Sequence, residues 1–178
     1  NQQVLANKLC KISGMNSAFF CNSGSEANET ALKLARLHAN NKKLKNPKII
    51  IFDKSWHGRT IATLSATGNK SVQAGFKPLI GGFVKCQLND MKAVKKVINN
   101  NNVSAVILET IQGEGGIRIA EDKFLKEIRK ITLQKDILLI VDEVQTGIGI
   151  TGKWFFYHYA NIKPDIVKCC KALGQGVP

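Results

Sequence analysis

Short apolar runs alternate along this chain with longer amphipathic segments, and this alternation limits the possible folds more than any other feature. The runs are rich in Ile, Val and Leu, which favours buried strands, and the segments between them repeat apolar residues at helical spacing. We expect strands at 18–21, 48–52, 81–86, 103–109, 137–141 and 165–169. We expect helices at 2–12, 25–40, 90–99 and 121–135, a short helix after a loop at 55–60, and a Gly-rich loop at 112–116. Strands that alternate with helices predict an α/β fold with a mostly parallel sheet and flanking helices.

The composition argues against several classes of protein. No apolar stretch is long enough to span a bilayer, and the N-terminus lacks the basic-then-apolar pattern of a signal peptide, so we expect a cytoplasmic protein without a membrane partner. Five cysteines form an odd set without a C-x-x-C pair. This pattern favours reduced thiols and predicts neither a disulfide framework nor a metal site.

The formal net charge of +13 raises the question of a nucleic-acid partner. The lysines are, however, scattered over several predicted helices and a loop, and no aromatic residues are interleaved with them for base stacking. The abundance of Lys, Asn and Ile is also typical of a compositional bias in the coding sequence. We therefore expect no nucleic-acid partner.

Polar residues directly follow several of the predicted strands. In "ILLIVDEVQTG" (137–147), the apolar run leads straight into Asp142 and Glu143. Burying an ionised carboxylate costs several kcal/mol unless a cation or hydrogen-bond donors compensate it, so Asp142 either lies at an exposed edge of the sheet or faces a positive group. Ligands of parallel α/β sheets collect outside the carboxyl ends of the strands, which makes this edge the candidate site.

Two motifs near other strand ends each allow two interpretations. "NSGSEANE" (22–29) opens a helix, and it is either an ordinary Ser N-cap with first-turn acids or a phosphate site made by free backbone N–H groups. "SWHGRT" (55–60) lies on a loop, where Trp56 either packs in the core or stacks on a planar ligand. His57 is either a structural histidine or a general base, and Arg59 could bind a carboxylate.

Lys171, in "KCCKALGQG", follows the last predicted strand. A lone lysine in a strongly basic chain is usually a solvated charge, whereas a buried lysine has a lowered pKa and can attack a carbonyl. An aspartate such as Asp142 opposite a pyridine nitrogen would keep that nitrogen protonated. Together with a phosphate site at a helix start, these residues describe pyridoxal phosphate chemistry.

Five motifs occur in the same order as in one enzyme family: "FFCNSGSEANETALKLAR", "HGRTIATLSATG", "ILETIQGEGG", "VDEVQTGIG" and "KALGQG". The chain thereby resembles the pyridoxal-phosphate aminotransferases that act on acetylornithine, ornithine and 4-aminobutyrate. The resemblance covers nearly the whole chain and implies the large domain of the fold type I aminotransferases. It also implies that residues 1–178 are the central part of that domain, with an N-terminal segment and a C-terminal small domain outside this sequence.

The resemblance assigns a role to each matching position, and it implies pyridoxal 5'-phosphate as the cofactor and no metal. In that assignment Lys171 is the catalytic lysine that forms the Schiff base, and Asp142 is the catalytic partner of the ring nitrogen. The other positions bind the cofactor or the substrate, or lie beside them: Gly24 and Ser25 at the phosphate, Trp56 and Val144 on the two ring faces, Gln145 near the ring hydroxyl, Arg59 and Glu114 at the substrate, and Glu109 as a nearby acid.

The resemblance is strongest to the family members that act on acetylornithine. It implies transfer of an amino group from N2-acetylornithine to 2-oxoglutarate, giving N-acetylglutamate semialdehyde and glutamate, in arginine biosynthesis and by a homodimer. Ornithine, succinylornithine or 4-aminobutyrate as the donor is the alternative within the family. A non-catalytic remnant of the fold is the alternative outside it, because Ile150 stands where the family generally has Arg.

Overall fold

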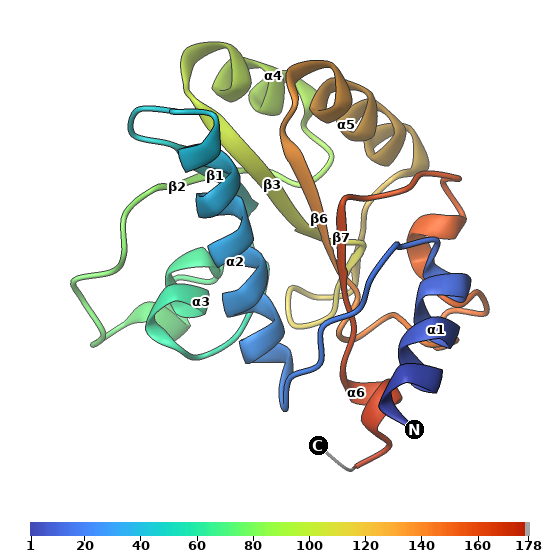
Figure 1. Cartoon of the computed structure of the whole chain (residues 1–178). Helices are drawn as coiled ribbons and strands as arrows, with labels where there is room; N and C mark the ends of the chain where they lie inside the picture. Colours follow the sequence, from blue (N-terminus) through green and yellow to red (C-terminus); the bar gives the residue numbers. More distant parts are fainter. Residues whose placement is uncertain (177–178) are drawn as a thin grey trace.

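The computed structural model describes residues 1–176, so the last two residues of the predicted segment 1–178 lie outside the described residues. Its centre is a five-stranded sheet in the order β2-β1-β3-β6-β7, in which every neighbouring pair is parallel (Figure 1). The strands are β1 (Lys48–Phe52), β2 (Phe83–Cys86), β3 (Val103–Glu109), β6 (Leu138–Asp142) and β7 (Ile166–Lys168). A two-stranded antiparallel hairpin, β4 (Ile111–Gln112) and β5 (Arg118–Ile119), encloses the predicted Gly-rich loop.

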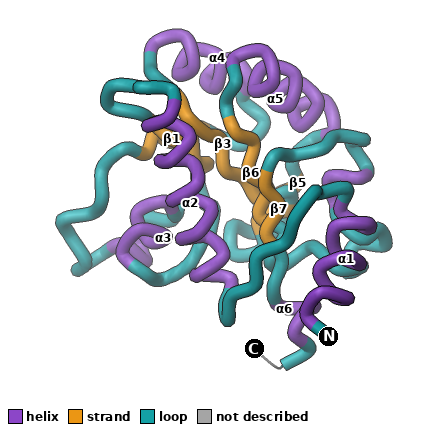
Figure 2. Tube along the Cα trace, viewed as in Figure 1, coloured by secondary structure: helices purple, strands orange, loops and turns teal. Residues whose placement is uncertain are grey.

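Six α-helices accompany the sheet in the described part of the chain. They are α1 (Gln2–Ser13), α2 (Gly24–Asn41), α3 (Ile61–Ala66), α4 (Met91–Asn100), α5 (Asp122–Lys135) and α6 (Lys171–Gly174). Figure 2 shows α2 and α3 on one side of the sheet, with α4 and α5 on the other. Among residues 1–176, no helix has the length and apolar character needed to cross a membrane.

The strand β1 packs apolar side chains on both faces of the sheet, because helices cover both faces. Ile50 and Phe52 of β1 belong to the core cluster that includes apolar residues of α4 and α5. Ile49 and Ile51 point the other way and pack in the cluster that includes Ala31 of α2. This alternation follows from the two-residue repeat of a strand, and it explains why the parallel strands read as continuous apolar runs.

The predicted α/β fold with a mostly parallel sheet is confirmed. Strands 48–52 and 103–109 have the predicted bounds, and the remaining predicted helices and strands, apart from 18–21, differ from the observed ones by one or two residues at their ends.

The predicted strand at 18–21 is wrong. This segment is irregular, and Phe19 is 75% exposed. A strand needs a neighbour to pair its backbone N–H and C=O groups, and in the described chain no strand pairs with this segment. Instead, residues 15–21 help to line a cavity of about 750 Å³ that α1, α2 and β7 also border.

Phe52 provides a test of the core on the α4 and α5 side of the sheet. Its ring is fully buried and meets the Phe124 ring edge-on, with 5.7 Å between the centroids. We expect Phe52→Ala to lower the free energy of unfolding by about 3 to 5 kcal/mol, because it removes buried contacts and leaves a cavity. Phe19→Ala, the same change at an exposed position, should alter it by only about 0.5 kcal/mol. Urea denaturation measures both, and equal losses would contradict this description of the core.

Candidate active site

Three ionisable residues form one row across the carboxyl ends of three neighbouring strands. Glu109, the last residue of β3, is in register with Asp142, the last residue of β6. Asp142 is in turn in register with Lys168, the last residue of β7. All three are buried, between 3% and 5% exposed. The sheet thus places two carboxyl groups and one ammonium group together at the edge where the sequence predicts a site.

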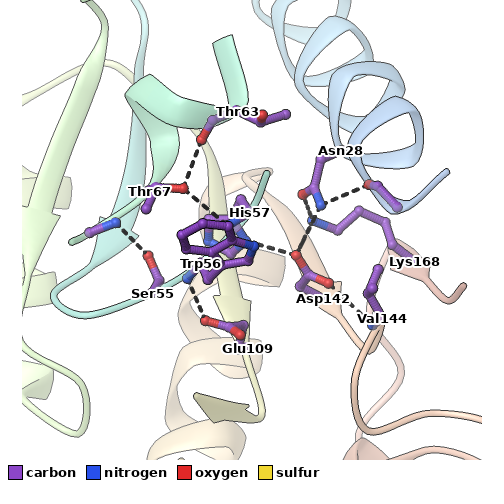
Figure 3. A network of polar contacts seen from close by, with 12 residues as sticks. Asn28, Ser55, Trp56, His57, Thr63, Thr67, Glu109, Asp142, Val144 and Lys168 are labelled. Atoms are coloured by element: carbon purple, nitrogen blue, oxygen red, sulfur yellow. Dashed lines mark hydrogen bonds and ion pairs between the residues drawn. The ribbon is translucent and has the colours of Figure 1, made fainter. Parts of the chain in front are cut away.

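Asp142 is the centre of a buried polar network (Figure 3). Its Oδ2 atom accepts hydrogen bonds from Asn28 Nδ2 at 3.1 Å and Lys168 Nζ at 3.2 Å, and it lies 2.7 Å from His57 Nδ1. Its Oδ1 atom accepts the backbone N–H of Val144 at 3.2 Å. Lys168 also contacts Asn28 Oδ1. Of the two positions expected for Asp142, the structure shows the buried one that faces a positive group, and that group is Lys168.

The protonation of these groups follows from their burial and their partners. Burial alone would raise the pKa of Asp142, but the Lys168 ammonium and the hydrogen bond with His57 outweigh it and lower that pKa. Burial lowers the pKa of Lys168, against the opposing attraction of Asp142. Burial and the neighbouring Asp142 charge raise the pKa of Glu109 to about 8. Near neutral pH the row therefore carries an ionised Asp142 and a protonated Glu109.

The loop after β1 holds His57 and Trp56 against this row. The backbone N–H of Trp56 donates to Glu109 Oε2 at 2.8 Å, and that of His57 donates to Thr67 Oγ1 at 3.1 Å. Burial lowers the pKa of His57, which favours the neutral ring that donates from Nδ1 to Asp142. Its Nε2 atom is buried without a hydrogen-bond partner in the described chain. The position of His57 supports the structural interpretation, in which it orients Asp142.

The N-terminus of α2 lies beside the same network. Ser23 is its N-cap and accepts the backbone N–H of Glu26, as the N-cap interpretation predicts. The N–H groups of Gly24 and Ser25 make no hydrogen bond to another described residue, so they remain available to an anion. A Cβ atom at Gly24 would come within 3.0 Å of Val144. Only glycine therefore fits here without moving Val144.

Gly58 allows the loop after β1 to lie close to the start of α2. Gly58 has a φ of +132°, and a Cβ atom there would lie 2.6 Å from both Ser25 Oγ and Thr63 Oγ1. Any larger residue would push the loop away from α2. The predicted Ser25 therefore lies where α2, α3 and the loop meet.

Other predicted site residues lie at the surface or apart from the network. Arg59 is exposed, with its guanidinium 5.7 Å from the centre of the half-buried Trp56 ring. Gln145 is half-buried, and Glu114 is exposed. Lys171, the first residue of α6, is exposed rather than buried, and its assignment as the Schiff-base lysine stays a prediction.

Sequence reasoning missed two members of the network, Lys168 and Asn28. The signal for Lys168 was a lysine inside an otherwise apolar strand, at the end where ligands collect. The signal for Asn28 was its position one helical turn after Gly24, which places both on the same face of α2. Within residues 1–176, no group of three or more His, Cys, Asp or Glu side chains could hold a metal ion.

Comparison with known sequences places the whole chain in one family. The family model described as "Aminotransferase class-III" matches residues 1–178. The acetylornithine aminotransferase of Nitrosomonas europaea is 50% identical over 179 residues, which are 100% of this chain and 46% of that protein. The acetylornithine aminotransferase of Bacillus subtilis is 46% identical over 99% of this chain and 45% of that protein. The chain thus spans about half the length of these curated relatives.

Solved structures show the same fold. The ornithine aminotransferase of Toxoplasma gondii superposes with a TM-score of 0.93 at 32% identity, over 98% of this chain and 42% of that one. The N-acetylornithine aminotransferase of Stenotrophomonas maltophilia has a TM-score of 0.84 at 37% identity, over 99% of this chain and 43% of that one. The match over all residues and the shared fold together show that this chain belongs to the class-III aminotransferase family.

Proposed function

We propose that this protein is a pyridoxal-phosphate-dependent aminotransferase that moves an amino group from N2-acetylornithine to 2-oxoglutarate, in arginine biosynthesis. The observation that carries the proposal is the buried, ionised Asp142 beside the free N–H groups at the start of α2. This arrangement offers a fixed negative charge and an anion site in one place. The acetylornithine aminotransferases that are 46% to 50% identical over essentially the whole chain support the substrate.

The residues present suit the cofactor at both ends of its ring. The N–H groups of Gly24 and Ser25 would hold the phosphate, because the positive end of the α2 dipole favours an anion. The Asp142 carboxylate would hold the protonated ring nitrogen. Trp56 and Val144 would cover the ring faces, and Gln145 would reach the ring hydroxyl. The cofactor of the Toxoplasma gondii ornithine aminotransferase structure is PLP at its active site, which supports the same cofactor here.

The reaction requires two groups from the protein, a carboxylate that stays ionised and an amine that transfers protons. When bound, pyridoxal phosphate supplies a carbonyl carbon for the amino group and a ring that accepts electrons. Asp142 keeps its negative charge because His57 and Lys168 lower its pKa. Lys171 would bind the cofactor covalently and then move the proton as a general base. Arg59 and Glu114, both exposed, would contact the substrate at the mouth of the site.

The chain's place in the whole enzyme is also a proposal. We infer that residues 1–178 are the central part of the cofactor-binding large domain, supported by relatives about twice as long. The resemblance further supports a homodimer in the cytoplasm. A donor such as ornithine is the second candidate, because the ornithine aminotransferase of Toxoplasma gondii superposes with a TM-score of 0.93.

Lys171 can be tested by trapping. After incubation with pyridoxal phosphate and reduction with borohydride, we expect mass spectrometry to find the adduct on Lys171, because its exposed amine can reach an aldehyde. Lys171→Ala should abolish the adduct, whereas Lys163→Ala, a change at another exposed lysine, should preserve it. An adduct on any other lysine of the unmodified protein would refute this assignment.

The amino donor can be identified from the cofactor itself. With the cofactor bound, the true donor converts it to its amine form, which changes its absorbance. We expect N2-acetylornithine to drive this change fastest among N2-acetylornithine, ornithine, succinylornithine and 4-aminobutyrate. A faster change with ornithine would favour the second candidate. Absence of change with every amine, in a protein that does form the Lys171 adduct, would favour the non-catalytic alternative.

Glu109 makes the stability of the protein depend on pH. Its carboxyl group is protonated in the folded state up to about pH 8 but ionises near its ordinary pKa when unfolded. At pH values between the unfolded and the folded pKa of Glu109, unfolding therefore releases a proton. The free energy of unfolding consequently falls as the pH rises, by about 1.4 kcal/mol per pH unit. In Glu109→Gln, whose amide oxygen can still accept the Trp56 N–H, we expect this loss to disappear. Urea denaturation from pH 5 to pH 8 measures it.

Glu121→Gln is the matched control, because Glu121 is an exposed acid before α5 whose side chain makes no capping hydrogen bond. Its unfolding free energy should follow the pH dependence of the unmodified protein. If Glu109→Gln also followed that dependence in parallel, Glu109 would not be protonated in the folded protein.

A further inference from the structure

Lys168 is a buried charge for which the proposed reaction has no role. It ends β7, directly in register with Asp142 on β6, and its residue surface is 3% exposed. Figure 3 shows it extending from β7 to Asp142 opposite His57. Its Nζ atom contacts Asp142 Oδ2, and it also contacts Asn28. The ammonium group therefore occupies one of the positions around Oδ2 from which a protonated ring nitrogen could bind Asp142.

The Oδ2 atom of Asp142 is fully occupied, whereas Oδ1 has one partner. Oδ2 has three partners, and Oδ1 accepts the Val144 N–H. Each partner of Oδ2 has a second contact, since Asn28 Nδ2 also donates to the Gly24 carbonyl, the His57 backbone N–H donates to Thr67, and Lys168 Nζ contacts Asn28 Oδ1. Lys168 has the longest and most flexible side chain of the three. A ring N–H that enters this network would most easily take the place of Lys168.

The charges around Asp142 also indicate that Lys168 is the group that a protonated ring would displace. Asp142 is ionised, and Glu109 is protonated near neutral pH. Within residues 1–176, Lys168 supplies the one positive charge in contact with Asp142, with neutral His57 on the other side. A protonated ring beside a charged Lys168 would place two cations on one buried carboxylate. Like charges in a buried site repel strongly. Burial already lowers the pKa of Lys168, because it disfavours the charged form. When a second cation arrives, the Lys168 side chain can therefore lose its proton or move out of the pocket.

We propose that Lys168 is the resident counter-ion of Asp142, and that the cofactor's ring nitrogen would bind Asp142 Oδ2 by displacing the Lys168 ammonium group. Lys168 thereby sets the affinity for the cofactor without taking part in the covalent chemistry. This inference rests on pyridoxal phosphate as the proposed cofactor, but it does not depend on the role of Lys171.

Pyridoxamine phosphate is the probe that separates the effect of Lys168 on cofactor affinity from covalent binding by Lys171. It has the phosphate and the ring nitrogen but an amine in place of the aldehyde, so it cannot bind a lysine covalently. We expect Lys168→Met to bind it at least about tenfold more tightly than the unmodified protein, because breaking the ion pair no longer opposes binding. Lys163→Met, the same change at an exposed position, should leave the affinity unchanged. Equilibrium dialysis or a fluorescence titration at pH 7 measures all three.

Two further variants keep the test decisive if Lys168→Met does not fold, since it leaves Asp142 without its cation. Lys168→Gln retains a hydrogen-bond donor without the charge and should also bind more tightly. Lys168→Arg retains the charge and should show no gain. Circular dichroism and the melting temperature report whether each variant is folded.

A pyridoxamine phosphate analogue with carbon in place of the ring nitrogen tests whether Lys168 acts on affinity through the ring nitrogen. Its affinity should be the same for the unmodified protein and Lys168→Gln, because it has no ring nitrogen to compete for Asp142. A tenfold gain for this analogue as well would overturn the proposal, as would equal or weaker binding of pyridoxamine phosphate by both uncharged variants. If neither the unmodified protein nor any variant bound pyridoxamine phosphate, this proposal and the proposed cofactor would both be overturned. If the proteins bound it without the expected gain, only the role of Lys168 would be overturned.

Discussion

The ionised carboxylate of Asp142, buried at the end of β6, is the interaction on which the site depends. A lone charge in this position would cost several kcal/mol, and the fold compensates it with groups from four separate parts of the chain. β7 supplies Lys168, α2 supplies Asn28, the loop after β1 supplies His57, and the turn after β6 supplies the Val144 N–H. The strand order, the helix placement and the loop conformation are therefore linked through one carboxylate.

Most of the fold follows from the repeat of apolar residues. The runs at 48–52 and 103–109 are buried on both faces, and their bounds are visible in the sequence because charged or polar residues interrupt them on both sides. The segment 18–21 has the same apolar character, yet it forms no strand. A run of apolar residues shows that a segment can be buried, whereas pairing requires a neighbouring strand, which composition does not reveal.

The site was predictable only in part, for a similar reason. Asp142 and Gly24 stand out locally, one as a carboxylate directly after an apolar run and the other as the glycine of a helix start. Lys168 does not stand out, because it is one of 26 basic residues and three positions away from a more conspicuous lysine. Its importance lies in the register between β6 and β7, which pairs it with Asp142. Register depends on how the whole sheet assembles.

The two lysines at the end of the chain differ because the strand ends between them. Lys168 is the last residue of β7, so its side chain is held in the buried row beside Asp142. Lys171 begins α6, beyond the irregular residues Cys169 and Cys170, and its side chain reaches solvent. The Lys168 ammonium donates to Asp142, and this pairing opposes the loss of the proton that nucleophilic attack requires. The exposed Lys171 side chain lies outside this buried row. The same short segment thus carries a buried lysine that balances the charge of Asp142 and an exposed lysine that we propose for covalent chemistry.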